Sequence, residues 1–251
     1  MRYVFCTIAI GQKYIDSAVN LVKQLNDISN EHHFIIVTDN TEHVVDNVTF
    51  IEVPKDKKLF IQNYFNYNLK YLPIKHSSEL DFDYIIFIDA DWSLGDEYST
   101  EKVHNVLDFM EINKYDFCFE RPHSIGDGKT QDNTMFWKHK RDFYDLLNTT
   151  DFDEGHVVNE QFLIFKNNDK LKEFCLFWES LSERASEGNL WAFAEGVEIG
   201  MSAAITKMSY EYYGWQRILN NCFNFTSLDG TFYIKKYENT RKYYSINGFR
   251  N

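Results

Sequence analysis

The sequence lacks several features that would place it in a particular class of protein. Its 251 residues contain no run of eighteen apolar residues, and Met1-Arg2 leads directly into a strand-like segment instead of a basic and apolar leader. We therefore expect a cytoplasmic protein with no transmembrane segment. The four cysteines form no Cys-x-x-Cys pair, which favours buried free thiols over disulfides or a zinc site. They are Cys6, Cys118, Cys175 and Cys222.

Positive charge and proline are also scarce. The chain has 26 Lys and Arg against 38 Asp and Glu, a formal net charge of -12, and only 3 prolines. Nucleic-acid binders usually gather Lys and Arg on one face, so the acidic composition disfavours a nucleic-acid partner. Aromatic residues make up 17% of the chain. Most of these rings must lie in the core, although the polar and aromatic segments 63–68 and 210–215 could also stack against sugar rings or bases.

The first half of the chain alternates strand and helix signals, which is typical of βαβ units in a mostly parallel, doubly wound sheet. We predict strands over 3–9, 34–37 and 48–53, an amphipathic helix over 14–25, and a helix over 59–72 that ends at Pro73. The second half is less regular. There we predict helices over 103–112, 136–147, 170–182 and 191–208, strands over 115–119 and 161–165, and a polar loop over 121–134.

The most informative segment runs from Asp83 to Ser93, where an apolar run ends in Asp89 and Asp91. An apolar run without alternation suits a strand buried on both faces, and ligands of open α/β sheets bind at the carboxyl ends of such strands. Two neighbouring acids repel each other unless a cation lies between them. Mg²⁺ and Mn²⁺ prefer oxygen ligands and commonly arrive with substrate phosphates. The competing interpretation is a solvated strand end followed by a turn at Gly95.

Two further Asp-x-Asp copies lack this context. Asp81 and Asp83 lie at the start of the strand, which is the wrong end for a ligand. Residues 151–153 follow two threonines in a polar stretch, where the acids suit a turn or a helix cap. We therefore predict metal and phosphate binding only at Asp89 and Asp91.

These features resemble the nucleotide-sugar-dependent glycosyltransferases of the GT-A fold. The matching parts are the N-terminal strand, the strand ending in Thr38-Asp39, the helix leading to residues 70–73, and the strand ending in Asp89-Ala90-Asp91. They cover residues 1 to about 120, and the remainder matches only loosely. The resemblance implies an α/β GT-A fold, Rossmann-like, with a mostly parallel central sheet flanked by helices and a smaller mixed acceptor-side region. Residues 1–120 would bind the nucleotide sugar, and residues 121–251 would form the acceptor-binding and catalytic half of the same domain.

The resemblance also implies roles for individual residues. In such enzymes the second acid binds Mn²⁺ or Mg²⁺ that bridges the donor diphosphate, and the first contacts the ribose or the metal, which assigns these roles to Asp91 and Asp89. Asp39 would lie near the nucleobase or ribose, an Asx-turn being the alternative. Lys70 could add positive charge near the diphosphate or be a solvated helix lysine. The implied reaction moves a sugar from a nucleotide diphosphate sugar, UDP-hexose being the commonest donor in the family, to a carbohydrate or other hydroxyl-bearing acceptor.

The catalytic group of these enzymes usually comes from the second half of the chain. Glu160 and Gln161 precede a predicted buried strand and could reach the anomeric carbon of the sugar. Glu195 and Glu198, three residues apart, are the alternative acceptor base, and a solvated helix face is the competing interpretation. The His-x-x-Gly-x-x-Lys motif that gives some retaining members a third metal ligand is absent. A histidine ligand would have to be His123, His139 or His156.

Two other functions stay open at this point. Residues 89–93 also resemble the nucleophile motif of haloacid-dehalogenase-like phosphatases, in which one aspartate is phosphorylated and the other is a general acid. That motif normally ends the first strand of its fold, whereas three strand signals precede it here. A non-catalytic nucleotide-sugar or carbohydrate-binding protein on the same scaffold is the third possibility. The sequence identifies neither the donor sugar and base, nor the acceptor, the stereochemical outcome or the oligomeric state.

Overall fold

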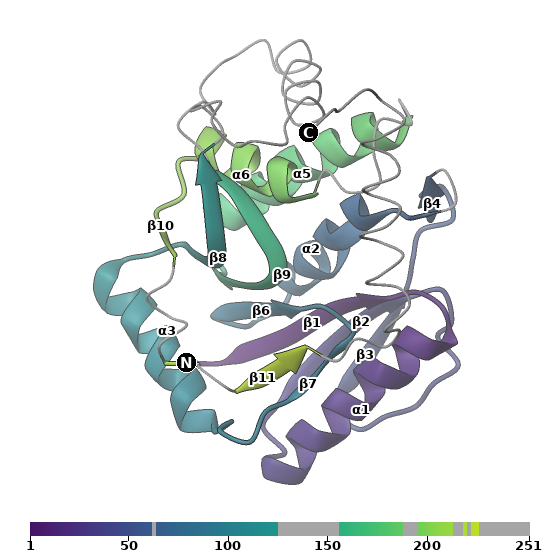
Figure 1. Cartoon of the computed structure of the whole chain (residues 1–251), viewed down its shortest axis with the longest axis vertical. Helices are drawn as coiled ribbons and strands as arrows, with labels where there is room; N and C mark the ends of the chain where they lie inside the picture. The colour runs from purple at the N-terminus through teal and green to yellow at the C-terminus, as the bar shows by residue number, and fades with distance from the viewer. Residues whose placement is uncertain (62–63, 125–155, 188–194, 213–217, 220–221, 226–251) are drawn as a thin grey trace, which may run out of the picture.

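A seven-stranded sheet forms the centre of the molecule (Figure 1). The computed structural model describes residues 1–61, 64–124, 156–187, 195–212, 218–219 and 222–225. The strands of this sheet are β1 (Tyr3–Ala9), β2 (His33–Thr38), β3 (Val48–Glu52), β6 (Tyr84–Ile88), β8 (Phe117–Ser124), β9 (His156–Lys166) and β10 (Tyr210–Tyr212). Their order across the sheet is β10-β8-β9-β6-β1-β2-β3.

Most neighbouring strands of this sheet run parallel. Strand β1 pairs in parallel with β2 and β6, β2 with β3, and β10 with β8. Strand β9 is the exception, because it runs antiparallel to both β6 and β8. The predicted α/β class with a mostly parallel central sheet is therefore confirmed.

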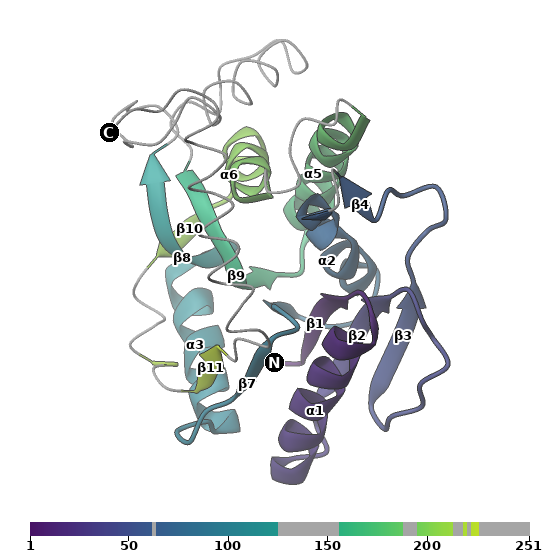
Figure 2. The ribbon, with the colours of Figure 1, turned by 45° about the vertical axis from the view of Figure 1, so that its right-hand side comes forward.

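Helices cover both faces of the sheet, as Figures 1 and 2 show. One core lies between the sheet and helices α1 (Gln12–Ile28) and α3 (Thr100–Asn113). The other lies beneath α2 (Tyr71–Ser78), α5 (Asp169–Glu187) and α6 (Glu195–Ile205). Alternate residues of one strand enter different cores: Phe5 lies in the first, whereas Val4 and Cys6 lie in the second. This two-sided burial explains the continuous apolar runs of the central strands.

Smaller elements connect these layers. Strands β4 (Phe60–Ile61) and β5 (Tyr64–Phe65) form an antiparallel pair, and the 3-10 helix η1 (Tyr67–Lys70) leads directly into α2. Strand β7 (Trp92–Leu94), just after the acid pair, runs antiparallel to β11 (Phe223–Phe225).

The helix predicted over 59–72 is wrong. The segment contains β4, β5, η1 and only the first two residues of α2, and the helix continues past Pro73 to Ser78. Proline is tolerated there because it lies in the first helical turn, where backbone N–H groups have no partner within the helix. Upstream, Phe60 is exposed while its neighbour Ile61 is buried, as in a strand.

The other predicted elements within the described residues are present, with ends shifted by a few residues. The predicted loop over 121–134 is wrong for its first four residues, which belong to β8. Residues 125–134, the helix over 136–147, the acids at 151–153 and residues 191–194 lie outside the described residues.

All four cysteines are buried and free, as predicted. Within the described ranges, every helix falls short of the length or apolarity needed to cross a lipid bilayer.

Candidate functional site

The order in which the chain adds strands to the sheet reverses between β1 and β6. From β1 the chain adds β2 and β3 on one side, and it then returns to place β6 on the other side of β1. Ligands of open α/β sheets bind outside the carboxyl ends of strands at such a switch point. Asp89 directly follows β6, and Gly11 lies two residues beyond β1. The acid pair therefore lies where this fold places a ligand.

Strand β9 places Glu160 and Gln161, both predicted from the sequence, beside Asp89. Because it runs antiparallel to β6, its residue Phe162 pairs with Ile88. The backbone N–H of Asp89 then donates to the carbonyl oxygen of Gln161 at 3.0 Å. Glu160 and Gln161 are thus next to the acid pair although they are about seventy residues away in the sequence.

Lys70 reaches this point from η1, and it is not a solvated helix lysine. Its side chain is 3% exposed, and its Nζ lies 2.8 Å from Asp89 Oδ1 and 3.0 Å from Oδ2. The same Nζ lies 4.0 Å from Glu160 Oε1. The rings of Tyr67 and Phe87 complete its surroundings, with centroids 5.3 and 5.8 Å from Nζ. Sequence reasoning missed Tyr67, which lies in the polar and aromatic segment 63–68.

The electrostatics of this group follow from burial and from an excess of acids. Burial lowers the pKa of Lys70, but Asp89, Glu160 and Glu195 together raise it above its ordinary value. Burial raises the pKa of Asp89 to about 7; Asp91 and Glu160 add to this rise, and Lys70 opposes it. In the described part of the chain, the carboxylates of Asp89, Glu160 and Glu195 act on the ammonium of Lys70, and that of Asp91 acts on Asp89. We call these four acids and Lys70 the acid cluster. Such a cluster favours the entry of further positive charge.

The donor set suits a hard dication that arrives with phosphates. Among the described residues, no group of three or more His, Cys, Asp or Glu side chains is placed to hold a metal ion. Asp89 and Asp91 would supply two oxygen ligands, and Mg²⁺ is usually bound by one or two carboxylates together with substrate phosphates. The histidines considered as a third ligand cannot be compared with this site, because His139 and the side chains of His123 and His156 lie outside the described residues.

Asp39 connects the end of β2 to the loop that follows β1. Its exposed carboxylate accepts a hydrogen bond from the backbone N–H of Gly11 at 2.9 Å. Gly11 has φ +83°, a conformation that glycine adopts without steric cost. The local turn is closed by other side chains, since Thr38 Oγ1 and Asn40 Oδ1 accept from backbone N–H groups two residues on. Asp39 thus lies at the carboxyl edge of the sheet, two strands away from Asp89.

Glu195 and Glu198 have different surroundings, although both are buried on α6. Glu195, 2% exposed, is close enough to Lys70 to raise the pKa of that lysine. Glu198 is fully buried, and its Oε2 accepts a hydrogen bond from Trp178 Nε1 at 3.0 Å and lies 2.7 Å from Ser182 Oγ. Burial raises the pKa of Glu198 to about 8. Of the two, only Glu195 joins the acid cluster, and neither lies on a solvated helix face.

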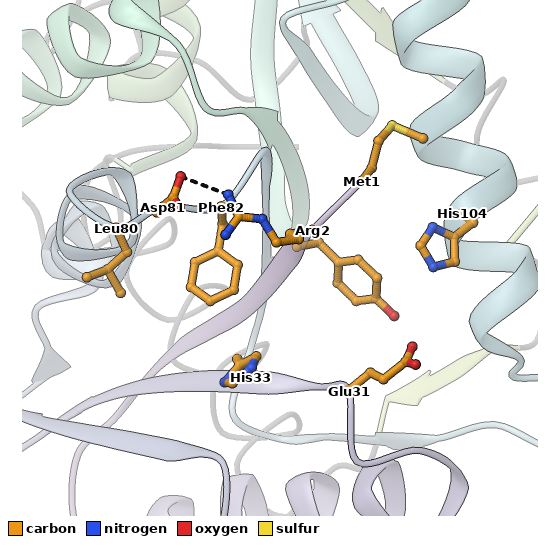
Figure 3. A pocket seen from close by; sticks show the side chains of 9 residues that line it. Met1, Arg2, Glu31, His33, Leu80, Asp81, Phe82 and His104 are labelled. Carbon is orange, nitrogen blue, oxygen red and sulfur yellow. Dashed lines mark ion pairs between the residues drawn. The ribbon is translucent and has the colours of Figure 1, made fainter.

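Hollows lie at opposite edges of the sheet. One, of about 610 Å³, lies between α1 and the residues that follow Asp91, and it is lined by Gln12, Lys13, Asp16, Ser17, Asn20, Trp92 and Ser93. The other, of about 570 Å³, lies at the amino ends of β1 and β6, where Arg2 and Asp81 form a 2.8 Å ion pair across it (Figure 3). The second hollow is thus at the edge of the sheet opposite to Asp89.

Comparison with known proteins gives matches among solved structures only. No protein-family model matches the chain, and no curated protein matches it in sequence. The galactosyltransferase LgtC, in complex with donor and acceptor sugar analogues, is similar at 13% identity over 83% of this chain and 72% of that one, with a TM-score of 0.49. An active-site mutant of LgtC is similar at 13% identity over 83% and 71%, with a TM-score of 0.47. Core-mannan synthase A from Aspergillus fumigatus, in an Mn/GDP form, is similar at 11% identity over 83% and 72%, with a TM-score of 0.45. These likenesses concern the fold.

Proposed function

We propose that this protein transfers a sugar from a nucleoside diphosphate sugar to a hydroxyl-bearing acceptor, with Mn²⁺ or Mg²⁺ held by Asp89 and Asp91. The observation that carries the proposal is the buried contact of Lys70 with both oxygens of Asp89, at the switch point of the sheet. A fixed ammonium beside carboxylates that suit a dication provides what a departing diphosphate needs. UDP-hexoses are the first donors to test.

Each residue of the site has a task in this reaction. The anomeric carbon–oxygen bond breaks, its electron pair stays on the diphosphate, and an acceptor hydroxyl oxygen forms the new bond to the anomeric carbon. Lys70, held in place by Asp89, offers a preorganised positive charge to the developing anion. The dication, when bound, acts as a Lewis acid on the same leaving group. Asp39, at the carboxyl end of β2, would bind the ribose or base.

The proton of the acceptor hydroxyl must pass to a base of the site. Glu160 and Glu195 are the candidates, because both act on Lys70 electrostatically and so lie beside the proposed diphosphate position. Gln161 is fixed next to them through its backbone bond to Asp89, and its side chain would bind the sugar.

The phosphatase interpretation is less favoured by the order of the strands. In that family the nucleophile motif normally ends the first strand, whereas β1, β2 and β3 all precede β6 in this sheet. The binding-protein interpretation shares the same site and differs only in the lack of turnover.

A thermal-shift screen of nucleotide sugars, with and without Mn²⁺, tests the proposal. A ligand at one hundred times its dissociation constant stabilises the folded state by about 2.7 kcal/mol. For a chain of this size that corresponds to a rise of roughly 5–10 °C in the unfolding midpoint. We expect one nucleotide sugar to give this shift, and to give it only when Mn²⁺ is present. On longer incubation the protein should slowly release the sugar from that donor.

The other outcomes of this screen point to the alternatives. Manganese-dependent binding without transfer or hydrolysis would indicate a binding protein. Hydrolysis of an aryl phosphate that is lost in Asp89→Asn would indicate a phosphatase. The absence of any shift across the nucleotide sugars would overturn the proposal.

A further inference from the structure

A chain of buried hydrogen bonds connects α6 to the short helix that carries Lys70. Glu198 Oε2 lies 3.0 Å from Trp178 Nε1 and 2.7 Å from Ser182 Oγ, both on α5. Ser182 Oγ also lies 2.9 Å from the carbonyl oxygen of Asn68. Asn68 belongs to η1 and comes two residues before Lys70. The contacts therefore run from Glu198 through Ser182 to the turn that positions the lysine of the acid cluster.

The number of donor hydrogens in this series of hydrogen bonds determines the direction of each bond. A serine hydroxyl carries one hydrogen, whereas an ionised carboxylate and a backbone carbonyl carry none. With an ionised Glu198, Ser182 would face two acceptors, and one of its two contacts would bring lone pairs together. A proton on Glu198 Oε2 removes this conflict. Glu198 then donates to Ser182, Ser182 donates to the Asn68 carbonyl, and Trp178 donates to the remaining lone pair of Oε2.

The surroundings of Glu198 also favour the neutral acid. The residue has no exposed surface, and its Oε1 has no hydrogen-bond partner among the described residues. An ionised carboxylate in such a place is costly without a cation, and none of the described ion pairs includes Glu198. Burial raises its pKa to about 8. Titratable groups on the surrounding elements include Lys70 and Tyr67 on η1, Glu160 on β9, Glu195 on α6, and Cys175, Glu179 and Glu183 on α5.

We infer that Glu198 is a neutral acid in the folded protein, and that its hydroxyl starts a one-way chain of hydrogen bonds, through Ser182 to the Asn68 carbonyl, which positions the turn carrying Lys70. Glu198 is then a positioning residue and not the base that deprotonates the acceptor. The inference rests on the proposed function only where it links this turn to donor binding. The protonation of Glu198 and its effect on η1 stand independently of any donor.

Glu198→Gln tests the protonation directly, because it removes the titrating group while keeping its size. In the infrared spectrum at neutral pH, we expect the wild-type protein to show a protonated carboxyl band that is absent from Glu198→Gln. Glutamine can either donate to Ser182 or accept from Trp178 at this position, but not both. We therefore expect Glu198→Gln to be less stable than the wild type in acid.

The pH dependence of unfolding is a second test of whether Glu198 is protonated in the folded protein. The folded-state pKa of about 8 is above the ordinary value of 4.5, so the folded protein holds this proton more tightly than the unfolded chain. The stabilisation is complete below pH 4.5 and is lost as the pH rises through 8. The unfolding midpoint of the wild type should fall over this interval relative to that of Glu198→Gln. If the unfolding midpoints of the wild type and Glu198→Gln changed with pH in parallel, and the wild type lacked the infrared band, Glu198 would not be a neutral acid.

Ser182→Ala tests the positioning of η1, with Ser180→Ala as the matched control. Ser180 lies on the same helix, but it is exposed and its hydroxyl bonds the Leu176 carbonyl of its own helix at 3.0 Å. In Ser182→Ala we expect faster amide hydrogen exchange over residues 67–72, and binding of manganese with UDP weakened by about fivefold. Ser180→Ala should change neither.

Unchanged exchange over residues 67–72 in Ser182→Ala would overturn the positioning role. Failure of the wild type to bind any nucleotide would refute the proposed function instead. The exchange, infrared and pH measurements would still decide the role of Glu198 in that case.

Discussion

Asp89→Asn and Asp91→Asn are expected to affect this protein in different ways, although the two acids lie one residue apart. Asp89→Asn leaves the ammonium of Lys70, 3% exposed, without its closest partner. Removing one member of a buried ion pair costs about 3–5 kcal/mol. Glu160, 4.0 Å from Lys70, and Glu195 remain and offset part of this loss. We expect a decrease of about 3 kcal/mol in the free energy of unfolding, or roughly 6–12 °C in the unfolding midpoint.

Asp91→Asn should leave stability almost unchanged. Asp91 is partly exposed, and its charge opposes the ionisation of Asp89, so its removal relieves repulsion within the acid cluster. We expect a stability change within about 0.5 kcal/mol. The same substitution removes one of the two proposed metal ligands. Manganese-dependent nucleotide binding should therefore weaken by at least about tenfold.

Urea unfolding followed by circular dichroism, together with calorimetric titration of UDP and Mn²⁺, measures both effects. Asp81→Asn is the matched control, because Asp81 also pairs with a cation, Arg2 at 2.8 Å, but both side chains are largely exposed. Its urea midpoint should equal that of the wild type. Equal destabilisation by Asp89→Asn and Asp91→Asn would refute the reasoning, as would full manganese-dependent binding in Asp91→Asn.

Four further outcomes are expected. Glu160→Gln should lower kcat by about a hundredfold with little change in donor KM, as steady-state kinetics would show; unchanged kcat would exclude Glu160 as the base. Gly11→Ala should cost about 1–2 kcal/mol in urea unfolding, because φ is +83° and an added Cβ would meet no atom within 4 Å, so that only backbone strain acts. Removing the divalent metal with EDTA should abolish nucleotide-induced thermal stabilisation, whereas persistence of the shift would contradict a metal-dependent site. A disulfide reagent should leave the native protein unlabelled and label four thiols after unfolding, since burial raises the pKa of Cys6, Cys118, Cys175 and Cys222.

The central strands could be predicted from the sequence because they are buried on both faces. The predicted range 3–9 coincides with β1, whose alternate residues enter the two cores. The prediction over 59–72 failed because a count of apolar residues does not distinguish a short hairpin and a 3-10 turn from a helix. Here the local structure depends on distant contacts, such as the bond from Asn66 Nδ2 to Ser186 Oγ at 2.9 Å.

The candidate site was only partly predictable for a similar reason. Asp89 and Asp91 follow directly from the end of one apolar strand. That Lys70 and Glu160 meet Asp89 depends on the order of the strands, and periodicity within a segment does not specify which strand becomes its neighbour. The difference between Glu195 and Glu198 depends on how α6 is rotated against α5, which their spacing of three residues leaves undetermined.

The balance of charge in the acid cluster bears on how a donor would enter. A diphosphate approaching Asp89, Asp91, Glu160 and Glu195 meets repulsion that the ammonium of Lys70 alone does not offset, since its charge is already engaged by both oxygens of Asp89. A dication between the acid pair and the phosphates would reverse the sign of that interaction, and it would also favour the ionised form of Asp89, whose pKa burial has raised. Lys70 would then hold the cluster together between turnovers and contribute to catalysis only as negative charge develops on the leaving group. In this arrangement the metal and the nucleotide would bind cooperatively, because each would supply the charge that the other requires.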